Sequence, residues 1–167
     1  RILSSAASDV YKRQPFTLFA PTDAAFNLLP AGTVTALLND IPQLTNILLH
    51  HVTSDSVMSS MLINGQIITT LLGSNITVTI NSNGVFIDNA QVIIADLVAD
   101  NGVVHVIDAV LLPSFGCTNP IACNYDPSAN ADDGSCLTDY GCTDPNAFNY
   151  DPTATCDNGS CIAIVYG

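Results

Sequence analysis

Before Gly65, apolar residues occur at helical spacing in segments that prolines interrupt. Residues 16–20 predict a short apolar strand, which Pro21 ends. Thr22 or Asp23 can cap a helix over residues 24–29. Two more short helices are predicted, one near residues 34–38 and one that begins at Pro42 and carries Leu44, Ile47, Leu48 and Val52. The first half is therefore expected to be mainly helical.

After Gly65 the pattern changes to short runs rich in β-branched residues. Turn residues at 73–75, 83–84 and 101–102 separate these runs. Strands are predicted over residues 67–71, 76–80, 85–87, 92–98 and 103–112. The run 76–80 alternates Ile and Val with Thr, which predicts one wet face, whereas 103–112 is apolar on both faces and is expected at the centre of the sheet.

An internal repeat follows a short linker at residues 114–115. Residues 116–136 align with residues 141–161 at an offset of 25, and 14 of 21 positions are identical. Chance would give one or two identities, so the two segments are true repeats. Each repeat is too polar to form a hydrophobic core, so disulfides, alone or together with a metal ion, are expected to hold it.

All six cysteines lie in these repeats: Cys117, Cys123, Cys136, Cys142, Cys156 and Cys161. With no Cys-x-x-Cys pair and no histidine after Cys117, the pattern indicates disulfides in an extracellular module and argues against a zinc finger. Each repeat has three cysteines, so at least one bridge must join the repeats. We favour connectivities with one bridge inside each repeat, in which Cys123 and Cys156 each belong to an intra-repeat pair.

Charge is distributed very unevenly. Arg1, Lys12 and Arg13 are the only basic residues, the chain has no Glu, and fourteen Asp follow Pro15. Nucleic acids and anionic lipids both bind through Lys and Arg, so neither is an expected partner. A partner recognised by charge would be a cation such as Ca²⁺, or a basic surface.

Residues 1–14 differ in composition from the rest of the chain. The segment SSAASDVYKRQ resembles translated adapter sequence, so we expect residues 1–14 to be a non-native leader and the true N-terminus to be missing. This segment lacks the apolar middle of a signal peptide. The longest apolar run, residues 91–113, is interrupted by Asp96, Asp100 and Asp108, and no membrane span is expected.

Two motifs in residues 15–113 resemble the paired signatures of the fasciclin domain family. They are TLFAPTDAAF at residues 17–26 and NGVVHVIDAVLLP at residues 101–113. Between them, LLHHV at residues 48–52 resembles the central Tyr-His segment of that family, with His50 in place of the Tyr. The resemblance implies a β-rich wedge with a helical insertion in a secreted or surface-anchored adhesion protein. The tail resembles short Cys/Asp-rich repeats of secreted bacterial surface proteins.

The predicted fold is therefore mixed α and β: a β-rich fasciclin-like wedge with a helical insertion, then a small disulfide-rich irregular region. The predicted function is non-catalytic binding to a protein or glycan, at an extracellular or cell-surface location. The alternative is a secreted or periplasmic receptor for a small apolar ligand. The chain has no Gly-x-Ser-x-Gly elbow, glycine-rich phosphate loop or paired Glu chemistry, which argues against an enzyme.

Three groups of residues are candidate sites. His50 and His51 are partner-binding candidates through the family resemblance, whereas His105, in an apolar run, is expected to be a core histidine that bonds a backbone group. In the tail, hard oxygen ligands make calcium the one candidate cofactor. The candidate ligands are Asp126, Asp132, Asp133, Asp151, Asp157 and Asn158. The alternative is that these side chains form Asx turns in a solvated loop.

Overall fold

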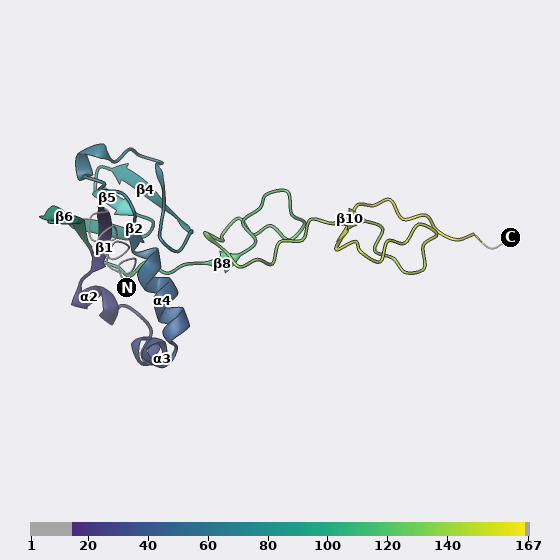
Figure 1. Ribbon diagram of the computed structural model, residues 1–167, viewed down its shortest axis with the longest axis horizontal. Coiled ribbons are helices and arrows are strands. Elements are labelled where there is room, and N and C mark those ends of the chain that lie inside the picture. The colour runs from purple at the N-terminus through teal and green to yellow at the C-terminus, as the bar shows by residue number, and fades with distance from the viewer. Residues whose placement is uncertain (1–14, 166–167) are drawn as a thin grey trace, which may run out of the picture. The chain divides into compact units, whose positions relative to one another are not determined.

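The computed structural model describes residues 15–165, which form two compact units (Figure 1). The first unit ends at Pro113 and the second begins at Ser114. The predicted leader, residues 1–14, lies outside the described residues. The predicted fold class is confirmed: a β-rich unit with a helical insertion precedes an irregular unit that contains three disulfides.

The first unit is built on one seven-stranded sheet with the order β2-β1-β7-β6-β5-β4-β3. Its strands are β1 (Phe16–Pro21), β2 (Val52–Thr53), β3 (Ile67–Thr69), β4 (Asn75–Asn81), β5 (Gly84–Ile87), β6 (Ala90–Ala99) and β7 (Gly102–Ile107). Strands β1 and β7 are parallel neighbours, and β3 to β7 form an antiparallel meander. The parallel pair places the two signature motifs next to each other.

The helical insertion connects β1 to β2. It consists of α2 (Asp23–Asn27), α3 (Thr33–Asn39) and α4 (Ile41–His50), and the 3₁₀ helix η1 (Ser59–Met61) follows β2. Thr22 caps α2 by accepting a hydrogen bond from Ala25 N (3.2 Å), as one of the two predicted caps. Helix α2 ends at Asn27, two residues before the predicted end. Asp40 caps α4 by accepting from Gln43 N (3.1 Å).

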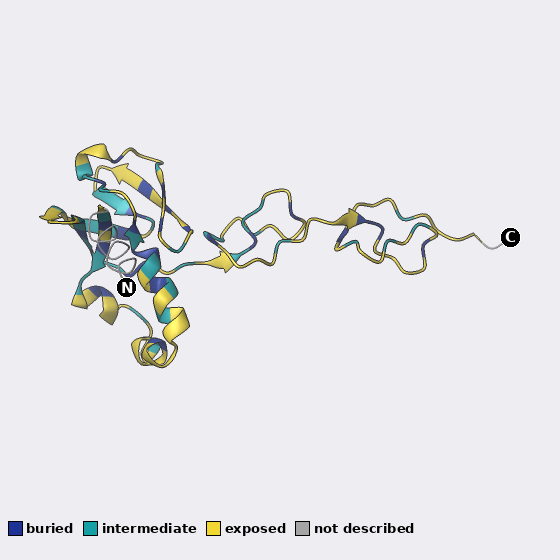
Figure 2. Cartoon of the chain, viewed as in Figure 1, coloured by how far each residue is buried: buried dark blue, intermediate teal, exposed yellow. Residues whose placement is uncertain are grey.

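The apolar side chains divide between two cores. The larger core lies in the sheet and its connections, and contains Phe19, Val57, Leu62, Ile68, Ile76, Val78, Ile87, Ala90, Ile107 and Leu111. The smaller core joins the helices to the segment after β7, and contains Ala25, Leu37, Ile47 and Val110. Exposed residues dominate the outer surfaces of α3 and α4 (Figure 2). The helices are therefore held by a small apolar cluster of their own.

Two details of the strand prediction differ from the structure. Strand β7 ends at Ile107, and its residues alternate between buried and half-buried positions. It does occupy an interior position, between β1 and β6. Val110 and Leu111 are buried without belonging to a strand, because the chain leaves the sheet after Ile107 and packs back on the cores. In β4, Ile76 and Val78 are buried as predicted, but Ile80 is exposed.

The second unit repeats one backbone arrangement at the sequence offset of 25. In the first repeat, β8 (Phe115–Gly116) pairs with β9 (Ala131–Asp132), and in the second, β10 (Tyr140–Gly141) pairs with β11 (Cys156–Asp157). Ser114 accepts hydrogen bonds from Asn130 N and Ala131 N. The predicted linker at residues 114–115 is therefore part of the first repeat, because its backbone joins the first ladder.

Three disulfides hold this unit, and the intra-repeat pairs predicted for Cys123 and for Cys156 are both wrong. Cys117 bonds to Cys136 and Cys142 bonds to Cys161, which gives one bridge inside each repeat as predicted. Cys123 and Cys156 do not form intra-repeat pairs, because they bond to each other across the two repeats. The equivalent positions in the other repeat are Phe148 and Ala131, so neither cysteine has a counterpart in its partner repeat.

Candidate functional site

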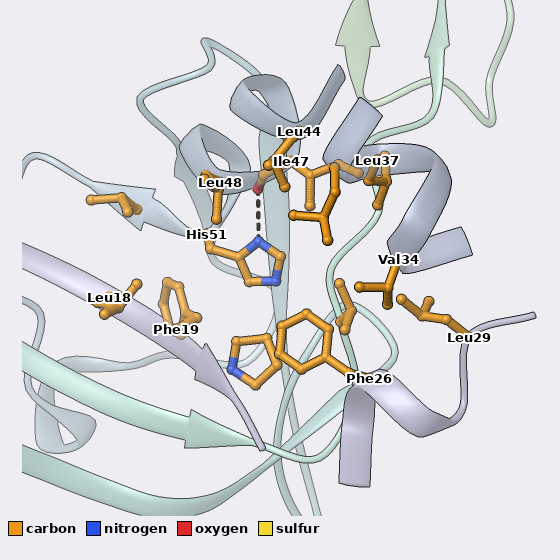
Figure 3. Close-up of a pocket in the computed structure, with 14 residues that line it drawn as sticks. Leu18, Phe19, Phe26, Leu29, Val34, Leu37, Leu44, Ile47, Leu48 and His51 are labelled. Carbon is orange, nitrogen blue, oxygen red and sulfur yellow. Dashed lines mark hydrogen bonds between the residues drawn. The ribbon is translucent and has the colours of Figure 1, made fainter. Parts of the chain in front are cut away.

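The first unit has an apolar groove among β1, the three helices and β2 (Figure 3). Its volume is about 210 Å³. It is lined by Leu18, Phe19, Pro21, Phe26, Leu29, Val34, Leu37, Leu38, Leu44, Ile47, Leu48, His51, Val52 and Val110. Thirteen of these fourteen residues are apolar, so the groove offers hydrophobic contact and very little hydrogen bonding.

The sequence builds the groove by helical periodicity. Leu44, Ile47, Leu48 and His51 follow the spacing that places side chains on one face of a helix. This face of α4 turns toward Phe26 of α2 across the groove (Figure 3). Because the small core fixes α2, α3 and α4, the lining side chains are held by packing rather than by polar bonds.

The rim of the groove is exposed although its lining is apolar. Leu38 is 62% exposed and Leu48 is 57% exposed, while Leu18, Phe26 and Val34 are each about two fifths exposed. Large apolar side chains grouped this way leave a contiguous hydrophobic patch, which in soluble proteins marks an interaction surface. The groove is therefore open to solvent at its rim and closed only at its floor.

His51 forms part of the groove wall and makes two hydrogen bonds. Its Nδ1 donates to the Ile47 carbonyl (2.7 Å), and its Nε2 accepts from Leu111 N (3.0 Å). These bonds require the neutral imidazole, and burial lowers the pKa of His51, although the bond to Ile47 acts in the opposite direction. His51 thus ties the end of α4 to the segment that follows β7.

His50 is fully buried and points into a different environment. Its Nδ1 lies 2.5 Å from Ser74 Oγ, which in turn lies 2.7 Å from Thr70 Oγ1. Its Nε2 has no hydrogen-bond partner among the described residues. Burial, and then the neighbouring His51, lower the pKa of His50 to about 4. We expected both histidines to contact a partner. The structure buries both imidazoles, and of the two His51 lines the groove, so partner contact stays a prediction.

His105 has the predicted role of a core histidine, and this prediction is confirmed. Its ring nitrogens bond to Val57 O (2.7 Å) and to Asp96 N (3.3 Å), and its ring stacks on Phe19 with 5.7 Å between centroids. The Asp96 carboxylate accepts from Ser59 N (2.7 Å) and from Ser59 Oγ. Ser59 thus bonds the carboxylate directly, and its hydroxyl is not paired with the imidazole as a serine nucleophile would be.

Sequence reasoning missed the role of Asp96. The register of β6 against β7 shifts on both sides of Ile94, and Asp96 lies within this irregularity with φ of +60°. At this bulge the Asp96 carboxylate accepts a hydrogen bond from the backbone N–H of Ser59, the first residue of η1. Its position inside an apolar run was the available signal. Hydrogen bonds from Ser59 lower the pKa of Asp96.

The candidate calcium ligands of the tail form Asx turns. In every case a side-chain oxygen accepts a hydrogen bond from the backbone N–H two residues later: Asp126 from Ser128, Asp132 from Gly134, Asp133 from Ser135, Asp151 from Thr153, Asp157 from Gly159 and Asn158 from Ser160. Within residues 15–165, no three or more His, Cys, Asp or Glu side chains come together as a metal site. The geometry agrees with the turn-forming alternative, and calcium binding stays a prediction.

The fold defines the first unit as a β-rich domain with a helical insertion. The model of the fasciclin domain matches residues 2–113. This chain belongs to the fasciclin domain family.

Several known proteins are similar to part of this chain. An uncharacterised protein of Synechocystis, sll1735, is 46% identical over 98 residues, which cover 59% of this chain and 73% of that protein. The immunogenic protein MPB70 of Mycobacterium bovis is 35% identical over 105 residues, or 63% of this chain and 53% of that protein. The FAS1 domain pair of the insect cell adhesion molecule Fasciclin I has a TM-score of 0.49 at 23% identity, covering 71% of this chain and 46% of that one.

The matches concern only part of each protein. Coverage of the two curated relatives is about three quarters of the first and about half of the second. Both alignments cover roughly three fifths of this chain, as expected for a shared domain beside a separate tail. Across residues 15–165, no helix is both long enough and apolar enough to cross a bilayer.

Proposed function

We propose that this chain is a non-catalytic, adhesion-type binding module that acts outside the cell or at its surface. The groove of the first unit contacts a protein or glycan on a cell surface, and the tail is a disulfide-held spacer. The observation that carries this proposal is the open apolar groove in a domain of the fasciclin family. The absence of Lys and Arg from residues 15–167 argues against nucleic acid as the partner.

The shape of the groove favours a large partner over a small one. Sites for drug-sized ligands usually have volumes of about 300–1,000 Å³ and bury most of the ligand. Here the volume is about 210 Å³, and rim residues such as Leu38 and Leu48 are more than half exposed. A macromolecule can cover this rim, whereas a small molecule in the floor would leave it in water.

The three disulfides support an extracellular location for the tail, because such bridges persist in oxidising environments. The resemblance of the tail to Cys/Asp-rich repeats of secreted bacterial surface proteins supports the same location. The tail keeps its shape through these bridges and the Asx turns, since its composition is too polar for a core. A role as a spacer requires no further chemistry from it.

A receptor for a small apolar ligand is the second candidate function, and the apolar lining of the groove favours it. Such a ligand would have to be compact, because the volume of the groove is only about 210 Å³. Native mass spectrometry of the purified chain would reveal a ligand that copurifies with it. A bound apolar molecule that is lost in groove variants would favour the receptor over adhesion.

Cell attachment tests the adhesion proposal directly. The full chain is coated on a surface, and cells are counted after washing, for the unaltered chain and for the double variant Leu38→Gln with Leu48→Gln. We expect the double variant to need an at least tenfold higher coating density for half-maximal attachment, because two large rim contacts are removed. Ile63→Gln is the matched control, since Ile63 is 69% exposed but lies outside the groove.

The attachment assay separates three outcomes. Attachment that is lost in the groove variant and kept in the Ile63→Gln control supports the proposal. Equal attachment of all three proteins would place the contact elsewhere on the molecule. Attachment no greater than to an uncoated surface would contradict an adhesion function for this chain.

A further inference from the structure

The apolar groove continues onto the open face of the sheet. Strand pairing aligns Val52 of β2 with Leu18 of β1, Leu18 with Val104 of β7, and Val104 with Leu97 of β6. Residues paired across strands lie on the same face of a sheet. These four residues therefore form one row, which we call the apolar track, and Leu18 and Val52 also line the groove.

The apolar track is accessible along its length. Leu18 is 38% exposed and Leu97 is 46% exposed, while Val52 and Val104 are half-buried. A shallow hollow lined by Leu18, Val52 and Val104 continues the groove in this direction. Four strands at a spacing of about 4.8 Å give the track a length of roughly 14 Å. This length matches about three turns of an α-helix laid across the strands, at about 5.4 Å a turn.

Two aspartates lie close in the chain to residues that line the groove. Asp23 lies two residues after Pro21, and Asp40 lies two residues after Leu38, so each Cα is within about 7.6 Å of a groove-lining Cα. Both side chains are exposed. A partner charge that comes within the Debye length of either carboxylate, about 8 Å at physiological salt, would interact with it.

No cation balances these carboxylates within the described first unit. Residues 15–113 contain seven Asp and no Lys or Arg. A second copy of the chain would bring the same negative charges to the surface and be repelled. An acidic or phosphorylated segment would be repelled in the same way. The occupant that fits both the apolar surface and its charged border is therefore apolar on one side and basic at its flanks.

We propose that the groove and the apolar track together bind an amphipathic helical segment of a partner protein, with an apolar ridge flanked by Lys or Arg. This proposal rests on the proposed binding function and specifies its surface and its partner chemistry. The ridge fills the groove at Phe26 and Leu48 and continues along the track. The basic flanks pair with Asp23 and Asp40, which set the orientation and favour a cationic partner over an acidic one.

Two synthetic helical peptides test the partner chemistry against the full, oxidised chain. Both have eighteen residues and the same leucine ridge, and they differ only in carrying Lys or Glu on the flanks. Isothermal titration calorimetry gives the dissociation constants at low and physiological salt. We expect the Lys peptide to bind at least tenfold more tightly than the Glu peptide, with a gap that narrows as salt is added.

Matched variants locate the binding surface. Leu38→Gln with Leu48→Gln is expected to raise the dissociation constant of the Lys peptide at least tenfold, whereas Ile63→Gln leaves it unchanged. Asp23→Asn with Asp40→Asn should raise the dissociation constant of the Lys peptide about threefold at low salt. Asn at position 40 still caps α4. The charge control is Asp55→Asn with Asp139→Asn, which removes the same net charge from two residues that do not line the groove and should have a smaller effect.

Each alternative result has a definite meaning. Equal affinity for the Lys and Glu peptides, or equal losses in the two aspartate pairs, would overturn the proposed cationic partner. Lys-peptide binding that is unchanged by Leu38→Gln with Leu48→Gln would overturn the proposed surface. If the peptides do not bind while the same groove variant loses cell attachment, the amphipathic partner is wrong and the adhesion function stands. Failure of attachment by the unaltered chain would instead contradict the proposed function.

Discussion

At the residue scale, the adjacent histidines at the end of α4 have different tasks. Both ring nitrogens of His51 are hydrogen-bonded, and they connect α4 to the segment after β7. His50 makes one contact, with Ser74, and its other nitrogen is buried without a partner among the described residues. A protonated imidazole at His50 would be a buried charge, which destabilises the fold.

We predict that His50 makes the first unit sensitive to acid. The unfolded chain binds this proton near pH 6.5 and the folded chain near pH 4, so the contribution of His50 to the free energy of unfolding is complete above pH 6.5. It falls as the pH decreases through this window, by about 3 kcal/mol in full. Urea unfolding should show that the free energy of unfolding decreases less between pH 7 and pH 4.5 for His50→Gln than for the unaltered chain.

The two proteins are compared by the change in their free energy of unfolding between pH 7 and pH 4.5, and not by its absolute value. His50→Gln changes packing at every pH, but only the titration of His50 changes the difference between pH 7 and pH 4.5. Lowering of the pKa of His51 acts in the same direction and is common to both proteins. Identical pH dependence in the two proteins would show that His50 does not carry the acid sensitivity.

Residue types predicted some of these roles but not their geometry. A histidine in an apolar run indicated the core position of His105, because a buried polar ring must find a backbone partner. The resemblance suggested partner contact for His50 and His51, but the packing of α4 against β2 and the Thr70 to Ser74 turn buries them. Asp96 depends on a bulge with positive φ, which no local pattern specifies.

At the element scale, the two tail repeats share one fold but differ in their third cysteine. Phe148 occupies the position of Cys123, and Ala131 occupies the position of Cys156. The bridge between Cys123 and Cys156 therefore joins the two repeats, and all six cysteines are paired. The cysteine count predicted one bridge inside each repeat and one between the repeats, but it assigned Cys123 and Cys156 to the wrong bridges.

We predict that each intra-repeat bridge holds its own repeat. A bridge that closes 19 residues contributes about 3 kcal/mol, which is large for a unit without a core. Hydrogen exchange followed by mass spectrometry should show loss of amide protection over residues 116–136 in Cys117→Ser with Cys136→Ser. Residues 16–113 should keep their protection, because their cores contain no cysteine.

The control removes the bridge between the repeats. Cys123→Ser with Cys156→Ser leaves both intra-repeat bridges and all Asx turns in place, so protection within each repeat should remain. Loss of protection throughout the tail in this variant would show that the repeats fold only as a joined pair. That result would contradict the assignment of stability to the individual repeats.

Helix and strand positions could be predicted from periodicity, whereas the groove could not. The helical spacing of Leu44, Ile47 and Leu48 identified one apolar face. What that face contacts depends on the parallel pairing of β1 with β7, which joins residues more than eighty positions apart. The sequence therefore indicated apolar surfaces, and the fold determined which of them stay open.

At the scale of the whole molecule, the two units are stabilised in different ways: the first by apolar cores and the second by disulfides. The first unit has apolar cores, an open groove and no disulfide, whereas the second has three disulfides and only small patches of buried residues. Both units are acidic, with seven Asp in each of residues 15–113 and 114–167. A cationic partner is thus attracted by both, but the apolar groove belongs to the first unit.

The central claim, that the groove is the contact surface, is tested most directly by NMR mapping. The isotopically labelled full chain is titrated with the Lys-flanked peptide, and amide shifts are followed for both units at physiological salt. We predict the largest shifts in β1, β2 and the helices, around Leu18, Phe26 and Leu48, with small shifts in residues 116–161. Shifts confined to the Asx turns of the tail would contradict the claim, because they would show binding by charge alone.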